Sequence, residues 1–141
     1  MPYGADRHDG WADGPGEVVA VTTIDNLGLD ACHLIKIDVQ GMEREVLLGA
    51  AETIRSHRPL LYVENDLRKK SEALIGQILE MDYRPYWHVP RLYNPDNYRS
   101  ERRNVFGDTV NENMLCRPSS RGRQIERLRA VASVHDWWQE A

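Results

Sequence analysis

The stretch His33–Ala50, "HLIKIDVQGMEREVLLGA", constrains the fold more than any other part of this 141-residue chain. Its aliphatic residues alternate from Leu34 to Val39, which predicts a β-strand. Gly41 then permits a tight turn, and from Met42 to about Arg55 the apolar residues recur on one helical stripe. A strand that passes through one turn into a helix is the repeating unit of α/β proteins.

The same alternation continues along the chain. A second strand is predicted at "PLLYVE", a second helix begins at Ser71, and "YRPYWHV" and "NENMLCRP" predict two further strands. Ahead of the first strand, Val18–Thr23 is extended and Asp25 is placed to cap a single helical turn through Leu29. Parallel strands need crossovers long enough for a helix. We therefore predict an α/β fold with a mostly parallel sheet, covered by helices on both faces.

Three segments are expected in this single domain. Residues 1–16 are rich in Gly, Asp and Pro and form a flexible lead, residues 17–118 form the body, and residues 119–141 form a C-terminal amphipathic helix. The apolar stripe of that helix is Ile125, Leu128, Val131, Val134 and Trp138. We expect Trp137 and Trp138 to dock the helix on the body, the alternative being a helix that binds a partner.

The composition excludes several classes of protein. The formal charge of −4 argues against a nucleic-acid partner, and no run of about 18 apolar residues is present that would span a membrane. The first residues lack the apolar centre of a signal peptide, which predicts a cytoplasmic location. Cys32 and Cys116 are interpreted as buried thiols, and the spacing of the histidines suggests no metal site.

Acidic residues stand where ligands bind in α/β sheets. Asp38 ends the first predicted core strand and Glu64 ends the second, so the two carboxylates are expected to share one crevice at the carboxyl ends of the strands. Glu43, in the first turn of the following helix, is placed to join them. Each has a structural alternative: Asp38 pairs with Lys36, and Glu43 stabilises the helix N-terminus. His88 is either a base or a structural histidine at a strand end.

These residues carry a resemblance. "VTTIDNL", "HLIKIDVQGMEREVLLGAAETI", "RPLLYVEN", "WHVPRLYNPDNY" and "NENMLCRP" together resemble the FkbM family of S-adenosylmethionine-dependent methyltransferases, over Val18 to Pro118. The most specific part is K-I-D-V-x-G-x-E followed by the L-x-G-A helix. The family usually has Glu where this chain has Gln40.

The resemblance implies a Rossmann-like class I methyltransferase fold of seven strands, in which Leu34–Val39 is the fourth strand and lies beside the first. The glycine-rich turn and the ribose-binding acid of the cofactor-binding half have no counterpart before Leu34. The chain thus resembles the carboxyl-terminal part of the domain, without the N-terminal cofactor-binding strands. Two expectations follow: this chain alone binds S-adenosylmethionine weakly and is inactive, and an exposed sheet edge promotes self-association.

The implied activity is methyl transfer to oxygen in a small-molecule or sugar-like acceptor. Asp38 is expected to orient the acceptor or to accept its proton, with Glu64 and His88 beside it. The residues expected to bind the acceptor are Glu43, Asn113 and, in a long loop that would serve as a lid, Tyr93, Asn94, Asn97 and Tyr98. The alternative is a non-catalytic remnant or interaction module of the same fold. A hydrolase using Asp38 and His88 would lack an identifiable nucleophile.

Overall fold

The computed structural model describes residues 18–122 and 124–139, so the predicted lead over 1–16 lies outside the described residues. Its elements are, in chain order, a short 3₁₀ turn η1 (Asp25–Leu27), β1 (Leu34–Ile37), α1 (Glu43–Leu48), α2 (Ala51–His57), β2 (Leu60–Glu64), α3 (Arg68–Glu80), β3 (Tyr83–His88), β4 (Asn113–Pro118) and β5 (Arg129–Ala130). The four core strands predicted from the sequence are confirmed. None of the described helices is long and apolar enough to cross a lipid bilayer.

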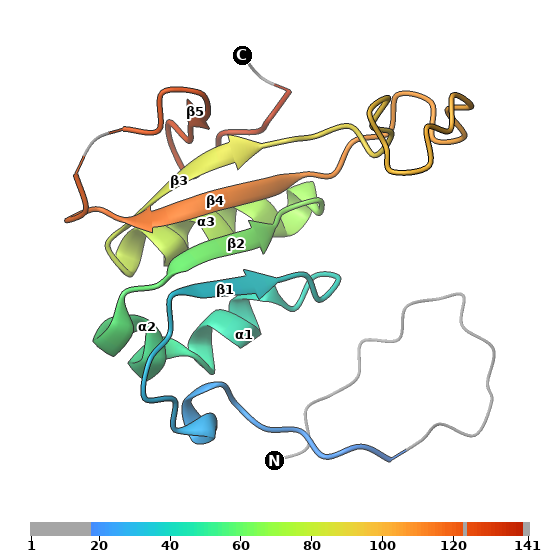
Figure 1. Ribbon diagram of the computed structural model, residues 1–141. Helices are drawn as coiled ribbons and strands as arrows, with labels where there is room; N and C mark the ends of the chain where they lie inside the picture. The colour runs from blue at the N-terminus through green and yellow to red at the C-terminus, as the bar shows by residue number, and fades with distance from the viewer. Residues whose placement is uncertain (1–17, 123, 140–141) are drawn as a thin grey trace.

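The five strands form one mixed sheet in the order β1-β2-β4-β3-β5 (Figure 1). β1 and β2 are parallel, and the pairs β2–β4, β3–β4 and β3–β5 are antiparallel. The prediction of a mostly parallel sheet is therefore wrong. The strands joined by helical crossovers, β1, β2 and β3, do run in one direction, but β4 returns from the long loop and inserts antiparallel between β2 and β3.

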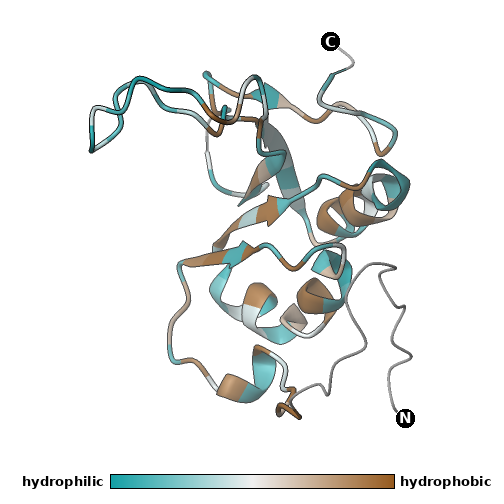
Figure 2. Ribbon diagram, turned by 90° about the vertical axis from the view of Figure 1, so that its right-hand side faces the viewer, coloured by the Kyte–Doolittle hydropathy of each residue, from teal (hydrophilic) through white to brown (hydrophobic). Residues whose placement is uncertain are grey.

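All three helices pack on one face of the sheet, whereas helices were expected on both (Figures 1 and 2). The side chains on the covered face form the apolar core, among them Ile35, Ile37, Leu61, Val63, Met114 and Cys116. Because side chains alternate along a strand, the intervening residues point to the opposite side, which we call the helix-free face. The strand residues on that face include Lys36, Tyr62, Glu64, His88 and Asn113. Cys116 is buried as expected, and Cys32 is half-buried.

The single helix predicted from Met42 to about Arg55 is in fact two helices, α1 and α2. The reason lies at Asp25. Its carboxylate accepts hydrogen bonds from the backbone N–H groups of Glu52 (3.1 Å) and Thr53 (2.8 Å), so it caps the N-terminus of α2. It makes no side-chain cap to its own turn η1, contrary to the sequence-based expectation. The extended segment over 18–23 is exposed and forms no strand.

The predicted helix over 119–141 is absent from residues 119–122 and 124–139, which form turns and the short strand β5. Asp136 accounts for this irregular path, because its carboxylate accepts hydrogen bonds from Arg129 at 2.9 Å and from the Ala132 backbone at 2.8 Å. Pairing of β5 with β3 satisfies further backbone groups. The expected docking does occur: Trp137 packs edge-on against Trp87, with ring centroids 5.8 Å apart.

Candidate functional site

Four of the residues predicted from the sequence come together where β1, β2 and β3 end. Asp38 directly follows β1, Glu64 and His88 are the last residues of β2 and β3, and Asn113 is the first residue of β4. In the sheet register Asn113 lies opposite both Glu64 and His88, so these three side chains form one row on the helix-free face. Side chains directly opposite one another across neighbouring strands lie about 5 Å apart at Cβ.

Asp38 and Glu64 form an interacting carboxylate pair with unequal surroundings. Lys36 donates to Asp38 Oδ2 at 2.6 Å, and this hydrogen bond holds the pKa of Asp38 below its ordinary value. Glu64 is 92% buried. Burial first, and the neighbouring charge of Asp38 second, raise the pKa of Glu64 to about 7. Below about pH 7 the pair therefore holds one proton, which resides on Glu64 beside an ionised Asp38.

Gln40 supplies the remaining hydrogen bond to this pair. Its Nε2 donates to Glu64 Oε2 at 3.0 Å from a turn in which Gln40 itself has a positive φ of 52°. A glutamate at this position would place a third negative charge there in place of a donor. The sequence predicted no contact for Gln40, because a turn residue gives no periodicity from which its direction can be read.

Tyr62 is a member of the site that sequence analysis missed. Its hydroxyl lies 2.7 Å from His88 Nδ1, and the two rings are tilted by 58°. Burial raises the pKa of Tyr62 above its ordinary value. Tyr62 reads as one more apolar residue in "LLYVE", but the two-residue period places it on the same face as Glu64.

Glu43 is buried and binds the backbone of the turn after β1. Its Oε1 accepts the N–H of Gly41 at 2.9 Å and that of Val39 at 3.3 Å. Its structural role is therefore to hold the turn that carries Asp38 and Gln40. Its expected role in acceptor binding stays a prediction.

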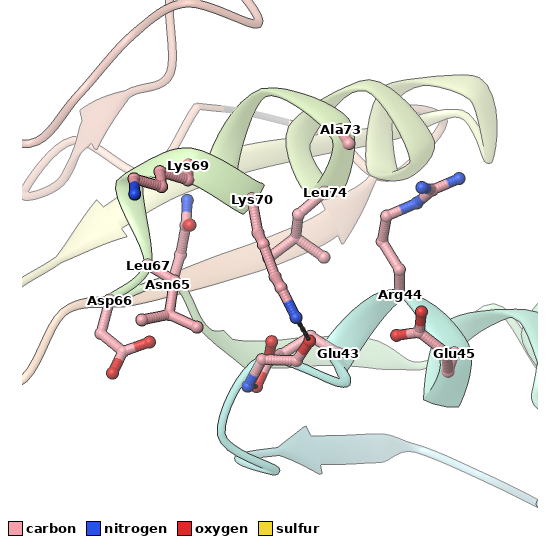
Figure 3. Close-up of a pocket in the computed structure, with 11 residues that line it drawn as sticks. Glu43, Arg44, Glu45, Asn65, Asp66, Leu67, Lys69, Lys70, Ala73 and Leu74 are labelled. Atoms are coloured by element: carbon pink, nitrogen blue, oxygen red, sulfur yellow. Dashed lines mark hydrogen bonds between the residues drawn. The ribbon is translucent and has the colours of Figure 1, made fainter. Parts of the chain in front are cut away.

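A hollow of about 210 Å³ lies on the other side of that turn, between the first turns of α1 and α3 (Figure 3). Lys70 reaches across it and donates to the Gly41 carbonyl at 2.9 Å. Charged side chains of both signs line it, among them Arg44, Glu45, Asp66 and Lys69. Sites for drug-sized ligands usually measure 300–1,000 Å³ and are mainly apolar, so this hollow matches neither in size nor in lining.

Gly41 is the described glycine that lies between a strand and a helix, at φ +91°. A Cβ there would lie 2.7 Å from Leu67 Cδ1 and 3.2 Å from Lys70 Nζ. The side chains of Leu67 and Lys70 therefore pack directly against this glycine.

The long loop comprises residues 89–112, between β3 and β4. It projects from the same edge of the sheet as the row Glu64–Asn113–His88, and it leans toward the helix-free face (Figures 1 and 2). Backbone bonds between Pro90 and Asn111, and between Leu92 and Thr109, close its base. Its predicted acceptor-binding residues mainly hold the loop itself: Tyr93 and Asn97 both donate to the Glu101 carbonyl, and Asn94 accepts the N–H of Asp96. Tyr98 is fully exposed. A lid role stays a prediction.

No group of three or more His, Cys, Asp or Glu side chains within the described ranges is arranged to hold a metal ion.

Residues 7–86 match the methyltransferase FkbM domain. The chain belongs to the FkbM methyltransferase family. No curated protein and no solved structure matches the chain. The matched region contains Asp38, Glu43 and Glu64, whereas His88, the long loop and Asn113 lie beyond it. Family membership indicates methyl transfer in general terms.

Proposed function

We propose that the protein transfers a methyl group from S-adenosylmethionine to an oxygen atom of a small, sugar-like acceptor, and that this chain supplies the acceptor side of the site. The observation that carries the proposal is the pair Asp38 and Glu64 at the carboxyl ends of the parallel strands β1 and β2. In α/β sheets this edge is where ligands bind. The common direction of β1, β2 and β3 also supports a Rossmann-like class of fold.

The two carboxylates suit two different tasks. A hydroxyl group that gains a methyl group must lose its proton, and a general base works best when its pKa lies near the working pH. Glu64 has such a pKa, about 7, because it is buried beside Asp38. Asp38, whose pKa is lowered by Lys36, stays ionised but is a weaker base. We therefore assign proton removal to Glu64, and to Asp38 the orientation of the acceptor and the tuning of Glu64.

S-adenosylmethionine supplies an electrophilic methyl group when it is bound. Because the glycine-rich turn and the ribose-binding acid have no counterpart before Leu34, binding by this chain alone is expected to be absent or no tighter than about 1 mM, or roughly −4 kcal/mol. Isothermal calorimetry with S-adenosylmethionine measures this directly. Micromolar binding would mean that the chain forms a cofactor site of its own.

The second candidate is a non-catalytic remnant or interaction module of the fold, and the lack of a glycine-rich turn before Leu34 favours it. The retained pair of carboxylates favours an enzyme. A cytoplasmic location remains a prediction from the sequence alone.

The test is methyl transfer by the protein expressed from its complete reading frame, with labelled S-adenosylmethionine and a panel of sugars and small alcohols. Asp38→Asn is expected to lower the transfer rate by about 10²-fold. Its unfolding free energy should change by less than about 1 kcal/mol, because the Lys36–Asp38 pair is largely exposed. Glu126→Gln, at an exposed carboxylate outside the candidate site, is the control. An unchanged rate in Asp38→Asn would leave Asp38 as the ion-pair partner of Lys36.

A further inference from the structure

The position of the imidazole proton of His88 depends on the direction of its hydrogen bond with Tyr62. The two residues come from β2 and β3, with β4 between them, and their side chains meet over the helix-free face at 2.7 Å. One atom of this hydrogen bond must donate, and the other must accept. Which one donates decides what His88 can offer to a substrate.

Tyr62 is the better donor. Its pKa is raised by burial, so the phenol keeps its proton. Within the described residues His88 Nδ1 is the sole hydrogen-bond partner of that hydroxyl. The nearest charged group on β1 is Lys36, which is itself a donor and cannot accept the phenol proton. If His88 Nδ1 donated instead, the Tyr62 proton would have no protein acceptor in this part of the chain.

His88 is therefore held with Nδ1 as acceptor, and a neutral imidazole in that state carries its proton on Nε2. Nε2 has no hydrogen-bond partner among the described residues. The other groups in its surroundings are Asn113 on β4, directly opposite, and Glu64 on β2 at the far end of the row. His88 accordingly presents a hydrogen-bond donor to the site, in place of the base that the sequence suggested.

We propose that Tyr62 is a positioning residue that holds His88 as the Nε2–H tautomer, so that His88 donates to a second oxygen of the methyl acceptor while Glu64 faces the oxygen to be methylated. This inference rests on the proposed function and narrows its substrate class. Glu64 and His88 stand two strands apart, about 10 Å between backbones. An acceptor that contacts both side chains must present two oxygens, as the vicinal diol of a sugar does.

An NMR measurement tests the proposal separately from methyl transfer itself. In ¹⁵N-labelled protein at pH 8, long-range ¹H–¹⁵N NMR is expected to show His88 with Nε2 protonated and Nδ1 bare. Tyr62→Phe should convert this signal into a mixture of tautomers, whereas Tyr98→Phe, at a fully exposed tyrosine, should leave it unchanged. Protonated Nδ1 in the unmodified protein, or an unaltered tautomer in Tyr62→Phe, would overturn the proposal whether or not methyl transfer is found.

The kinetic arm compares a diol acceptor with its analogue that lacks one hydroxyl. Tyr62→Phe and His88→Ala are expected to lower kcat/KM for the diol about tenfold, a change of about 1.4 kcal/mol, and to leave the analogue unaffected. His88→Gln keeps an N–H donor, so its kcat/KM for the diol should be close to that of the unmodified protein. Equal losses on both acceptors would overturn the donor role. Absence of transfer to every acceptor would instead contradict the proposed function, and the NMR result would still decide the tautomer.

Discussion

At the scale of single residues, the sequence predicted which side chains come together better than it predicted the contacts between them. Asp38, Glu64, His88 and Asn113 were predicted because the ends of strands are visible in the hydrophobic pattern, and the structure brings them together. The roles depend on contacts that no local pattern encodes. Tyr62 binds His88 across an intervening strand, and strand order is set by tertiary packing.

Glu64 makes stability depend on pH in a defined direction. Its pKa in the folded chain is about 7, above an ordinary value of 4.5. The folded state therefore binds more protons than the unfolded state in this range. The stabilisation is fully present below pH 4.5 and is lost as the pH rises through 7. Asp38 acts in the opposite sense, but only as the pH falls below its ordinary value of 3.8.

We predict that Glu64→Gln stabilises the protein at pH 8 by about 2 kcal/mol and has little effect at pH 4.5, because the amide cannot ionise. Urea unfolding at the two pH values measures this difference. The control is Glu126→Gln at an exposed position, which should change the unfolding free energy by the same amount at the two pH values. A destabilised Glu64→Gln at pH 8 would mean that the buried carboxylate is stabilised as an anion.

At the scale of elements, the turn between β1 and α1 sets the positions of Asp38 and Gln40. Gly41 adopts a positive φ in this turn. Its N–H group donates a hydrogen bond to Glu43, and its carbonyl accepts one from Lys70. The local sequence predicted this turn well. The C-terminal segment shows the opposite case. Its apolar residues have helical spacing, but the pairing of β5 with β3 and the hydrogen bonds to Asp136 outweigh helix propensity.

We predict that Gly41→Ala lowers the unfolding free energy by about 2 kcal/mol, since strain at a φ of +91° adds to the displacement of the Leu67 side chain, whose Cδ1 would lie 2.7 Å from the new Cβ. Gly28→Ala is the matched control, because Gly28 also has a positive φ, +59°, but open space around it. That change should cost about 1 kcal/mol. Thermal unfolding of both variants makes the comparison, and equal losses would show that the packing around Gly41 contributes nothing.

At the scale of the whole molecule, the expected parallel sheet failed because of β4. A strand that follows a long loop can insert on either side of its neighbours, and only tertiary packing selects the place between β2 and β3. The other large feature is the edge of the sheet. Among the described strands β1 pairs with β2 alone, and Leu34 on it is 58% exposed.

We predict that the chain associates through the edge of β1, because unpaired strand groups beside exposed apolar side chains template pairing with a second copy. The exposed segment that contains Val18 and Val21 adds to this apolar surface. Light scattering at micromolar concentration should detect dimers or larger species, and Leu34→Lys should reduce them by placing a charge at the edge. A compact monomer that binds no apolar dye would show that the edge is closed.

The central claim is that Glu64 removes the acceptor proton in methyl transfer, and the pH dependence of the transfer rate tests it most directly. With the protein from its complete reading frame, the rate is expected to rise with pH and level off above about 7, the pKa of Glu64. Glu64→Gln should lower the plateau about 10²-fold and abolish the rise, while Glu126→Gln should leave both unchanged. An unaltered rate and pH profile in Glu64→Gln would contradict the account.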